Sequence, residues 1–293
     1  MYCRFCEKQI LDDSECCPLC GKDQAAAPSN DDDDFDLDEF FSDTVSQEKN
    51  DEEIEKMFDI QDGVLVQFNP TRPKVSAVTI PDGVTTIGEG AFQCCGDLTI
   101  VEIPEGVTTI QKEAFHGCVK LSVVKFPKSL LYIDEYAFQY CNIMSLSIPE
   151  GVRHISDNAF IGNERLCSIT VADGNAVYHS QNHCLIETHS QTLVLGCCNS
   201  VIPANGSVTS IGKNAFNSCH DLISVTIPDS IVSIGDHAFL NTGLVCVRIP
   251  QSVRSIGIEA FGDCEDLYTI QVPHHTVIGR DAFSYCFGGV TRY

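Results

Sequence analysis

Residues 114–138 read AFHGCVKLSVVKFPKSLLYIDEYAF, a segment that begins and ends with the same Ala-Phe pair. Val124 and Phe126 alternate with outward positions, as in a short strand with one face on a core. Pro127 then ends the strand, because proline has no amide donor. Leu130 and Ile133 return apolar side chains to the core from the opposite side. The segment therefore predicts one coil with two core-facing walls.

This coil recurs along most of the chain. The Ala-Phe pair repeats every 22 or 23 residues, apart from one interval of 56, at Phe92, Phe115, Phe138, Phe160, Phe216, Phe239, Phe261 and Phe283. A proline preceded by an apolar residue follows in step, at Pro81, Pro104, Pro127, Pro149, Pro203, Pro228, Pro250 and Pro273. Such a period is typical of a solenoid, in which each coil buries its apolar edge only against its neighbours. We therefore expect a mainly β repeat solenoid over residues 63–293, built from short parallel strands and turns.

A second column of similar residues lies three positions after the repeat phenylalanine. It contains Cys95, Cys118, Cys141, Cys219, Cys264 and Cys286, with Asn163 and Thr242 in the other two copies. A small side chain that donates weakly can turn inward there and face the carbonyls of the loop. We expect this column to be structural rather than reactive.

The order Ala-Phe, Cys, Leu, Ile-Pro, Val and Ile-Gly in these copies resembles the BspA-like, treponemal-type, leucine-rich repeat family over about residues 63–286. The resemblance implies a right-handed solenoid with a binding role. Members of that family are often secreted adhesins. The chain departs from that group in its N-terminal segment.

That segment, residues 1–22, contains two Cys-x-x-Cys pairs. Cys3 and Cys6 form the first pair, and Cys17 and Cys20 form the second. Four thiolates complete a closed tetrahedral site, which Zn²⁺ favours in structural centres. We expect a structural zinc ribbon, with a rubredoxin-like iron site or a redox-active dithiol as alternatives; whether Cys16 contributes is open. The segment resembles the short bacterial zinc-ribbon family in these four cysteines.

Residues 23–62 form an acidic segment. Residues 29–62 carry 15 acidic residues against Lys49 and Lys56, which accounts for most of the net charge of −23. Like charges at this density resist compaction, so we expect a largely disordered linker. The alternative is a binding motif that folds on a partner and uses Phe35, Leu37, Phe40 and Phe41.

The period breaks at residues 172–200, between Phe160 and Phe216. Leu185-Ile186 and Leu193-Val194-Leu195 predict two strands around a turn, and residues 62–66 are similar and predict a cap at the start of the stack. The insertion also gathers His179, His183, Cys184, His189, Cys197 and Cys198. Their spacing matches no metal-ligand pattern, so we interpret them as packed or solvated side chains.

The sequence contains no nucleophile elbow, P-loop or dinucleotide-binding turn, so we expect no enzymatic activity, no catalytic residue and no bound organic cofactor. With 18 basic residues against 41 acidic ones, nucleic acid is an unfavourable partner. No apolar run is long enough to span a bilayer or to act as a signal peptide.

The outward strand positions hold Glu102, Lys125, Ser147, Thr170, Thr226, Arg248 and Gln271. This polar row of mixed sign favours a protein partner, whose identity the sequence does not reveal. The leading interpretation is a cytoplasmic protein-protein interaction module, and the alternative is an exported cell-surface adhesin. Seventeen cysteines in a chain without a signal peptide favour a reducing compartment. The oligomeric state is left open.

Overall fold

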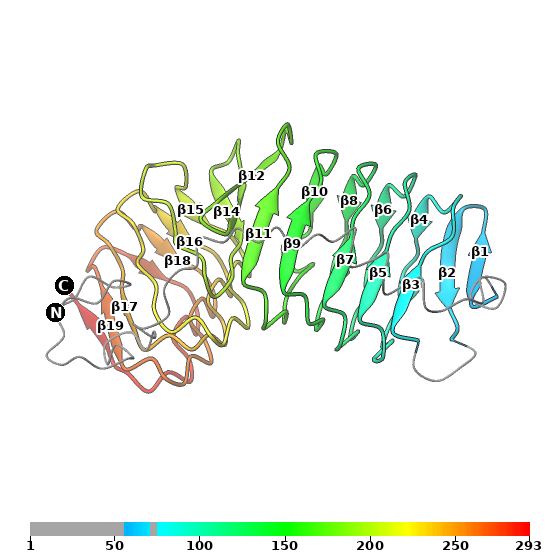
Figure 1. The fold of residues 1–293 in the computed structure, drawn as a ribbon. Helices are drawn as coiled ribbons and strands as arrows, with labels where there is room; N and C mark the ends of the chain where they lie inside the picture. The colour runs from blue at the N-terminus through cyan, green and yellow to red at the C-terminus, as the bar shows by residue number, and fades with distance from the viewer. Residues whose placement is uncertain (1–55, 71–74) are drawn as a thin grey trace, which may run out of the picture. The chain divides into compact units, whose positions relative to one another are not determined.

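The computed structural model describes residues 56–70 and 75–293, which form short strands and turns and contain no helix. The coils stack along one axis, and most coils contribute strands to two sides of the stack (Figure 1). An Ala-Phe turn joins the two sides. This arrangement confirms the mainly β solenoid.

One side of the stack is formed by the strands that follow the Ala-Phe turns. They make three short parallel sheets. The sheets are β3 (Ala77–Thr79), β5 (Ile100–Glu102) and β7 (Val123–Lys125); β9 (Ser145–Ile148) and β11 (Ser168–Val171); and β17 (Cys246–Arg248), β19 (Thr269–Val272) and β21 (Val290–Arg292). Inward residues such as Val101, Ile169 and Val247 are buried.

The other side is formed by the strands that precede the turns. The first sheet has the order β1-β2-β4-β6-β8-β10, with β1 (Phe58–Gln61), β2 (Val64–Phe68), β4 (Thr86–Ile87), β6 (Thr109–Ile110), β8 (Tyr132–Ile133) and β10 (His154–Ile155). The second has the order β12-β13-β14-β15-β16-β18-β20, with β12 (Tyr178–Gln181), β13 (Cys184–Glu187), β14 (Thr192–Leu195), β15 (Ser210–Ile211), β16 (Ser233–Ile234), β18 (Ser255–Ile256) and β20 (Val277–Ile278). Equivalent residues of successive coils pair in register, as Ile87 does with Ile110.

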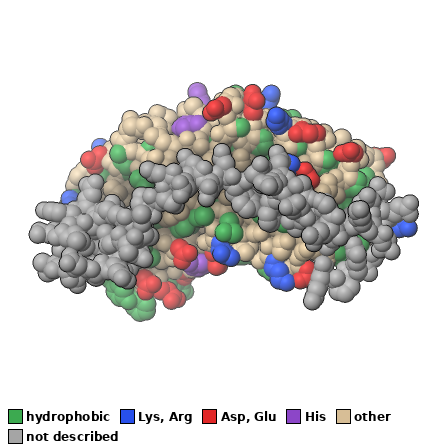
Figure 2. Space-filling view, viewed as in Figure 1, with side chains coloured by type: hydrophobic (Ala, Val, Ile, Leu, Met, Phe, Trp, Pro, Cys, Tyr) green, Lys and Arg blue, Asp and Glu red, His purple; other side chains and the backbone are tan. Residues whose placement is uncertain are grey.

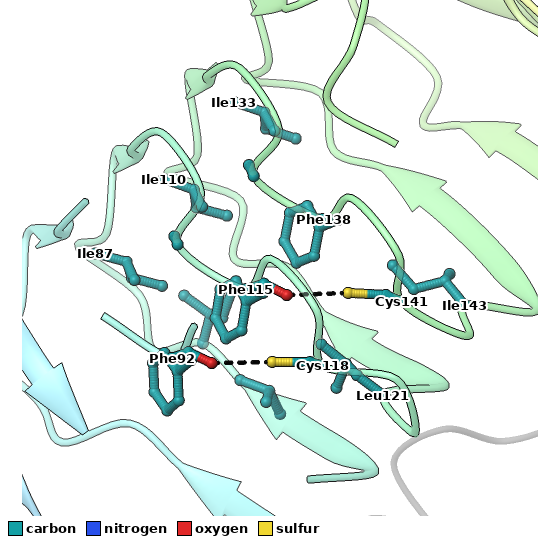
Figure 3. Packing of buried hydrophobic residues seen from close by; sticks show 14 of the residues in the cluster. Ile87, Phe92, Ile110, Phe115, Cys118, Leu121, Ile133, Phe138, Cys141 and Ile143 are labelled. Atoms are coloured by element: carbon teal, nitrogen blue, oxygen red, sulfur yellow. Dashed lines mark hydrogen bonds between the residues drawn. The ribbon is translucent and has the colours of Figure 1, made fainter. Parts of the chain in front are cut away.

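Phenylalanine rings fill the corner of each coil (Figure 3). The rings of Phe92 and Phe115 stack at 4.7 Å, and those of Phe115 and Phe138 at 5.0 Å. The stack continues to Phe160 at 5.3 Å. These spacings are close to the 4.7–4.9 Å between neighbouring strands, so rings and strands repeat together. A separate column of stacked rings runs through Phe216, Phe239, Phe261 and Phe283.

Four cysteines of the column, Cys118, Cys141, Cys264 and Cys286, tether their coils to the preceding coil. The Cys118 thiol donates to the carbonyl oxygen of Phe92 at 3.1 Å, and Cys141 donates to that of Phe115 at 3.2 Å (Figure 3). Asn163 makes the same contact with Phe138 at 2.8 Å. The side-chain hydrogen bond with Cys141 is the main cause that raises the pKa of Cys118, and burial raises it further. Burial also raises the pKa of Cys219. The Cys118 and Cys219 thiols are therefore protonated at neutral pH, which supports the structural role expected for this column.

Each series of coils begins with a hairpin. The β1–β2 turn at Asp62-Gly63 and the β12–β13 turn at Asn182-His183 place both central residues at positive φ, as in a type I′ turn. The two strands predicted in the insertion are confirmed as β13 and β14, and β12 is an additional strand. The predicted cap is confirmed, because β2 pairs with β4 at the start of the stack. β1 begins at Phe58, a few residues before the expected start at residue 63.

The irregular coil between Phe160 and Phe216 explains the interval of 56 residues. Gly196 stands where other coils have phenylalanine, since its amide donates to Ala215 O as that of Phe92 does to Ala114 O. A Cβ at Gly196 would lie 2.0 Å from the Phe216 ring, so only glycine fits. The first sheet also ends here, at β10. The Ile155 amide on β10 donates to the Tyr178 hydroxyl at 3.0 Å. The coils up to β11 are called the first stack below, and the coils from β15 onward are called the second stack.

The ring stack generates a prediction about stability. Phe115→Ala leaves a cavity between two neighbouring rings, so we expect it to lower the free energy of unfolding by about 3–5 kcal/mol. Tyr132→Ala is the control, because that side chain is 43% exposed on the outside of a coil and should cost far less. Urea unfolding followed by circular dichroism gives both values. Equal effects of the two substitutions would contradict a structural role for the stacked rings.

Candidate binding face

The outer face consists of the outward side chains on strands β3, β5, β7, β9, β11, β17 and β19. Its central row runs through Thr79, Glu102, Lys125, Ser147 and Thr170 in the first stack and through Thr226, Arg248 and Gln271 in the second. Most of these side chains are exposed, and the others are half-buried. The structure therefore places the predicted residues on the outside of the coils.

A charged pair marks the first-stack part of this row. Glu102 and Lys125 are register partners on β5 and β7, and a carboxylate oxygen of Glu102 lies 3.1 Å from the Lys125 ammonium. The Thr79 hydroxyl donates to the other carboxylate oxygen at 3.3 Å. A cross-strand ion pair this exposed stabilises a fold by less than about 1 kcal/mol. Its charges are more useful for orienting a partner than for holding the sheet together.

The row is not continuous, although the sequence predicted one extended face. Residues 222–228, which include Thr226, form no strand, and the irregular coil before them lacks this wall entirely. The residues around Glu102 and those around Arg248 therefore lie on separate sheets. The reason is the shortened turn of the irregular coil, in which Ile202 comes six positions after Gly196, whereas Ile103 comes eleven positions after Phe92.

The second stack carries an apolar patch that the sequence analysis did not identify. Val245 is 47% exposed, Tyr268 59% and Phe287 73%, and the rings of Tyr268 and Phe287 stack at 5.9 Å. The Tyr268 amide donates to Val245 O, so the two residues are neighbours on adjacent coils. Figure 2 shows hydrophobic side chains gathered at the lower edge of the C-terminal coils. We call Val245, Tyr268 and Phe287 the second-stack patch.

Arg248 provides a charged group on the same sheet. Its guanidinium lies 5.0 Å from the centre of the Tyr293 ring, which favours a cation–π contact. The Tyr293 hydroxyl donates to Ile249 O at 2.6 Å, which fixes the ring. Arg248 is itself exposed. The second stack therefore combines aromatic rings with one oriented cation.

Two groups of residues were considered as metal ligands: the four N-terminal cysteines, which were predicted to bind zinc, and the His and Cys residues of the insertion, which were expected to be packed or solvated. Cys3, Cys6, Cys17 and Cys20 lie outside the described residues, as does most of the acidic segment with its candidate motif. In the insertion, His179 Nδ1 lies 2.9 Å from the Thr188 hydroxyl, and Cys197 is buried. Residues 56–70 and 75–293 contain no group of three His, Cys, Asp or Glu side chains suited to a metal ion.

The same residues contain no helix long and apolar enough to cross a membrane. All twelve cysteines among them are free thiols. Most are buried or half-buried, and Cys94 and Cys246 are exposed.

The family model for the BspA type leucine-rich repeat region matches the chain in six copies, over residues 85–205 and 195–288. None of the curated proteins matches it.

Two solved structures are similar. A leucine-rich repeat protein from Bacteroides ovatus is 27% identical with a TM-score of 0.56, and the match covers 78% of this chain. The chain spans only 58% of that protein's length. A leucine-rich cell surface protein from Faecalibacterium prausnitzii is 27% identical with a TM-score of 0.51, and the match covers 74% of this chain and 79% of that one.

Proposed function

Because the chain belongs to the BspA-type leucine-rich repeat family, we propose that it is a non-enzymatic scaffold that binds a protein partner through its outer face. The second-stack patch is the observation that carries this proposal. Tyrosine, phenylalanine and arginine are enriched at the centres of protein interfaces, where they give most of the binding energy. Tyr268, Phe287 and Arg248 supply these side chains on neighbouring coils.

The rest of the outer face fits the polar rim of such an interface. Glu102 and Lys125 offer both signs of charge, and Ser147 and Thr170 offer hydroxyl groups. A nucleic acid would require a basic surface, whereas the chain carries a net charge of −23. A protein is therefore the best-supported partner.

Affinity capture with crosslinking in the native cell tests this proposal. The full chain should recover a protein partner, and the double variant Tyr268→Ala/Phe287→Ala should lower the recovered amount at least about tenfold, because it removes both anchors. Tyr132→Ala is the matched control, since it removes an exposed tyrosine from the opposite wall. Undiminished capture by the double variant, or recovery of only lipid or nucleic acid, would contradict the assignment.

We propose the cell surface as the location, rather than the cytoplasm favoured by the sequence. The similar protein from Faecalibacterium prausnitzii is a cell surface protein. The buried thiols of the solenoid are compatible with an oxidising exterior, because burial raises the pKa of Cys219 and the Cys118 thiol is engaged with Phe92 O. Such thiols are poor nucleophiles and do not oxidise readily.

Labelling of intact cells with a membrane-impermeant amine reagent distinguishes the two locations. A surface protein should be labelled before lysis to nearly the extent seen afterwards, through exposed lysines such as Lys120. A cytosolic protein of the same cells serves as the lysis control. Labelling that appears only after lysis would return the assignment to the cytoplasm.

We also propose a structural zinc site at Cys3, Cys6, Cys17 and Cys20, on the basis of their spacing. The purified chain should contain about one zinc ion. Cys3→Ser/Cys20→Ser should abolish zinc binding, whereas Cys94→Ser, which changes an exposed cysteine of the solenoid, should leave it intact. Elemental analysis measures the metal. Iron in place of zinc, or zinc retained by the double variant, would contradict the proposal.

A further inference from the structure

A cleft opens on the turn side of the solenoid at the irregular coil. Its volume is about 410 Å³, within the range of small-molecule sites. One wall comes from turns of the first stack, around Tyr140 and Asn158, and the other from turns of the second, around Asn217 and Asn241. The irregular coil between these walls has no Ala-Phe turn, because Gly196 stands at the phenylalanine position. We call this space the junction cleft.

The side chains of the cleft all project from Ala-Phe turns. Nearly every turn has a left-handed residue just before the alanine, Asn158 being the exception, and every turn has one two residues after the phenylalanine. Tyr136 has φ 58° at the first position, and Tyr140 and Asn241 have φ 56° at the second. These positions point side chains away from the core without affecting the packed rings. The turn edge can therefore vary in sequence while the coil stays the same.

The lining is polar and nearly neutral. Side-chain amides are prominent in it, at Gln139, Asn158, Asn214, Asn217 and Asn241. Each amide presents a donor and an acceptor side by side. The Asn217 amide donates to the Asn214 oxygen at 3.0 Å, and the Ser218 hydroxyl donates to the Asn217 oxygen at 2.9 Å, so this wall is already ordered.

Charged groups in the cleft balance one another. Lys213 and Asp263 give one charge of each sign, and the His237 ring lies 3.6 Å from Glu259. A phosphate or sulfate ligand would need more cations than this, and a metal ion would need more carboxylates. The lining thus fits an uncharged ligand with many hydrogen-bonding groups.

Tyr140 supplies a flat apolar surface at the cleft. The side chain is 52% exposed, although its ring is held in place. The His116 ring packs edge-on against it at 5.8 Å. On another side, a Cβ at Gly162 would lie 2.5 Å from a ring carbon, so the ring rests on the glycine backbone. An ordered, exposed aromatic ring can stack against the C–H face of a sugar.

We infer that the junction cleft binds a neutral oligosaccharide, with Tyr140 as the stacking platform and the amide side chains as hydroxyl partners. A saccharide offers hydroxyl groups that donate and accept, together with the apolar ring face that Tyr140 requires. An extended peptide would need an open strand edge, whereas every lining residue lies in a turn. This site is separate from the outer face and does not depend on the protein partner.

Calorimetry and ligand-observed NMR with the full chain test the inference. The probes are neutral oligosaccharides from glucans, xylans, mannans, galactans and chitin. We expect at least one of these saccharides to bind. Tyr140→Gly should weaken the affinity of the protein for that saccharide at least about tenfold, because a tenfold change in affinity corresponds to the loss of one contact of moderate strength. Glycine is chosen because the position has positive φ, so that the backbone is not strained. Asn241→Gly, on the opposite wall, should weaken binding as well.

Tyr285→Gly is the matched control, because Tyr285 has the same place in the last turn, φ 56° and 79% exposure. It should leave affinity unchanged. Tyr140→Phe, which keeps the ring, should retain most of it. No binding by any of the saccharides, equal loss in the Tyr285 variant, or binding of only sulfated sugars or peptides would overturn the inference.

Discussion

The stack depends on the agreement between two distances. Phenylalanine rings on adjacent coils stack at 4.7–5.3 Å, and paired strands lie about 4.8 Å apart, so one repeat satisfies both. The thiols of Cys118 and Cys141 then reach the carbonyl of the preceding coil without any adjustment. Each coil buries its core side chains against its neighbours, which is why a single coil could not fold alone. The burial of Phe115, Ile110 and Leu121 depends on this shared register.

Much of this architecture could be predicted from the spacing of a few residue types. The positions of Phe115, Pro127 and Cys118 within one repeat were enough to assign the core, the strand end and the inward donor, because identical residues one coil apart must occupy identical environments. The second-stack patch could not be found in this way. Val245 and Tyr268 occupy a position before the strand, where exposure depends on the neighbouring turns rather than on the repeat itself.

The irregular coil shows the limit of counting residues. The interval between Phe160 and Phe216 indicated an insertion with two strands, and the structure contains both. The sequence did not show that Gly196 takes the place of a core phenylalanine, that the Tyr178 hydroxyl accepts the last ladder hydrogen bond, or that the outer face divides there. These features depend on contacts between segments of different coils. The junction cleft, which lies between the turns of the two stacks, was equally hidden.

The two hairpins also bear on how such a chain can grow during evolution. The β1–β2 hairpin offers β2 to the next coil through Leu65, and the β12–β13 hairpin is followed by β14, which pairs with β15 through Leu193, so the coils after each hairpin have a strand on which to stack. A hairpin with its following coils is thus a cassette that a gene could duplicate or exchange without redesigning the interior. Adding one such cassette would lengthen the protein's reach and would also create another boundary like the one beside Gly196. In this architecture, length and the number of ligand sites can increase in a single genetic step.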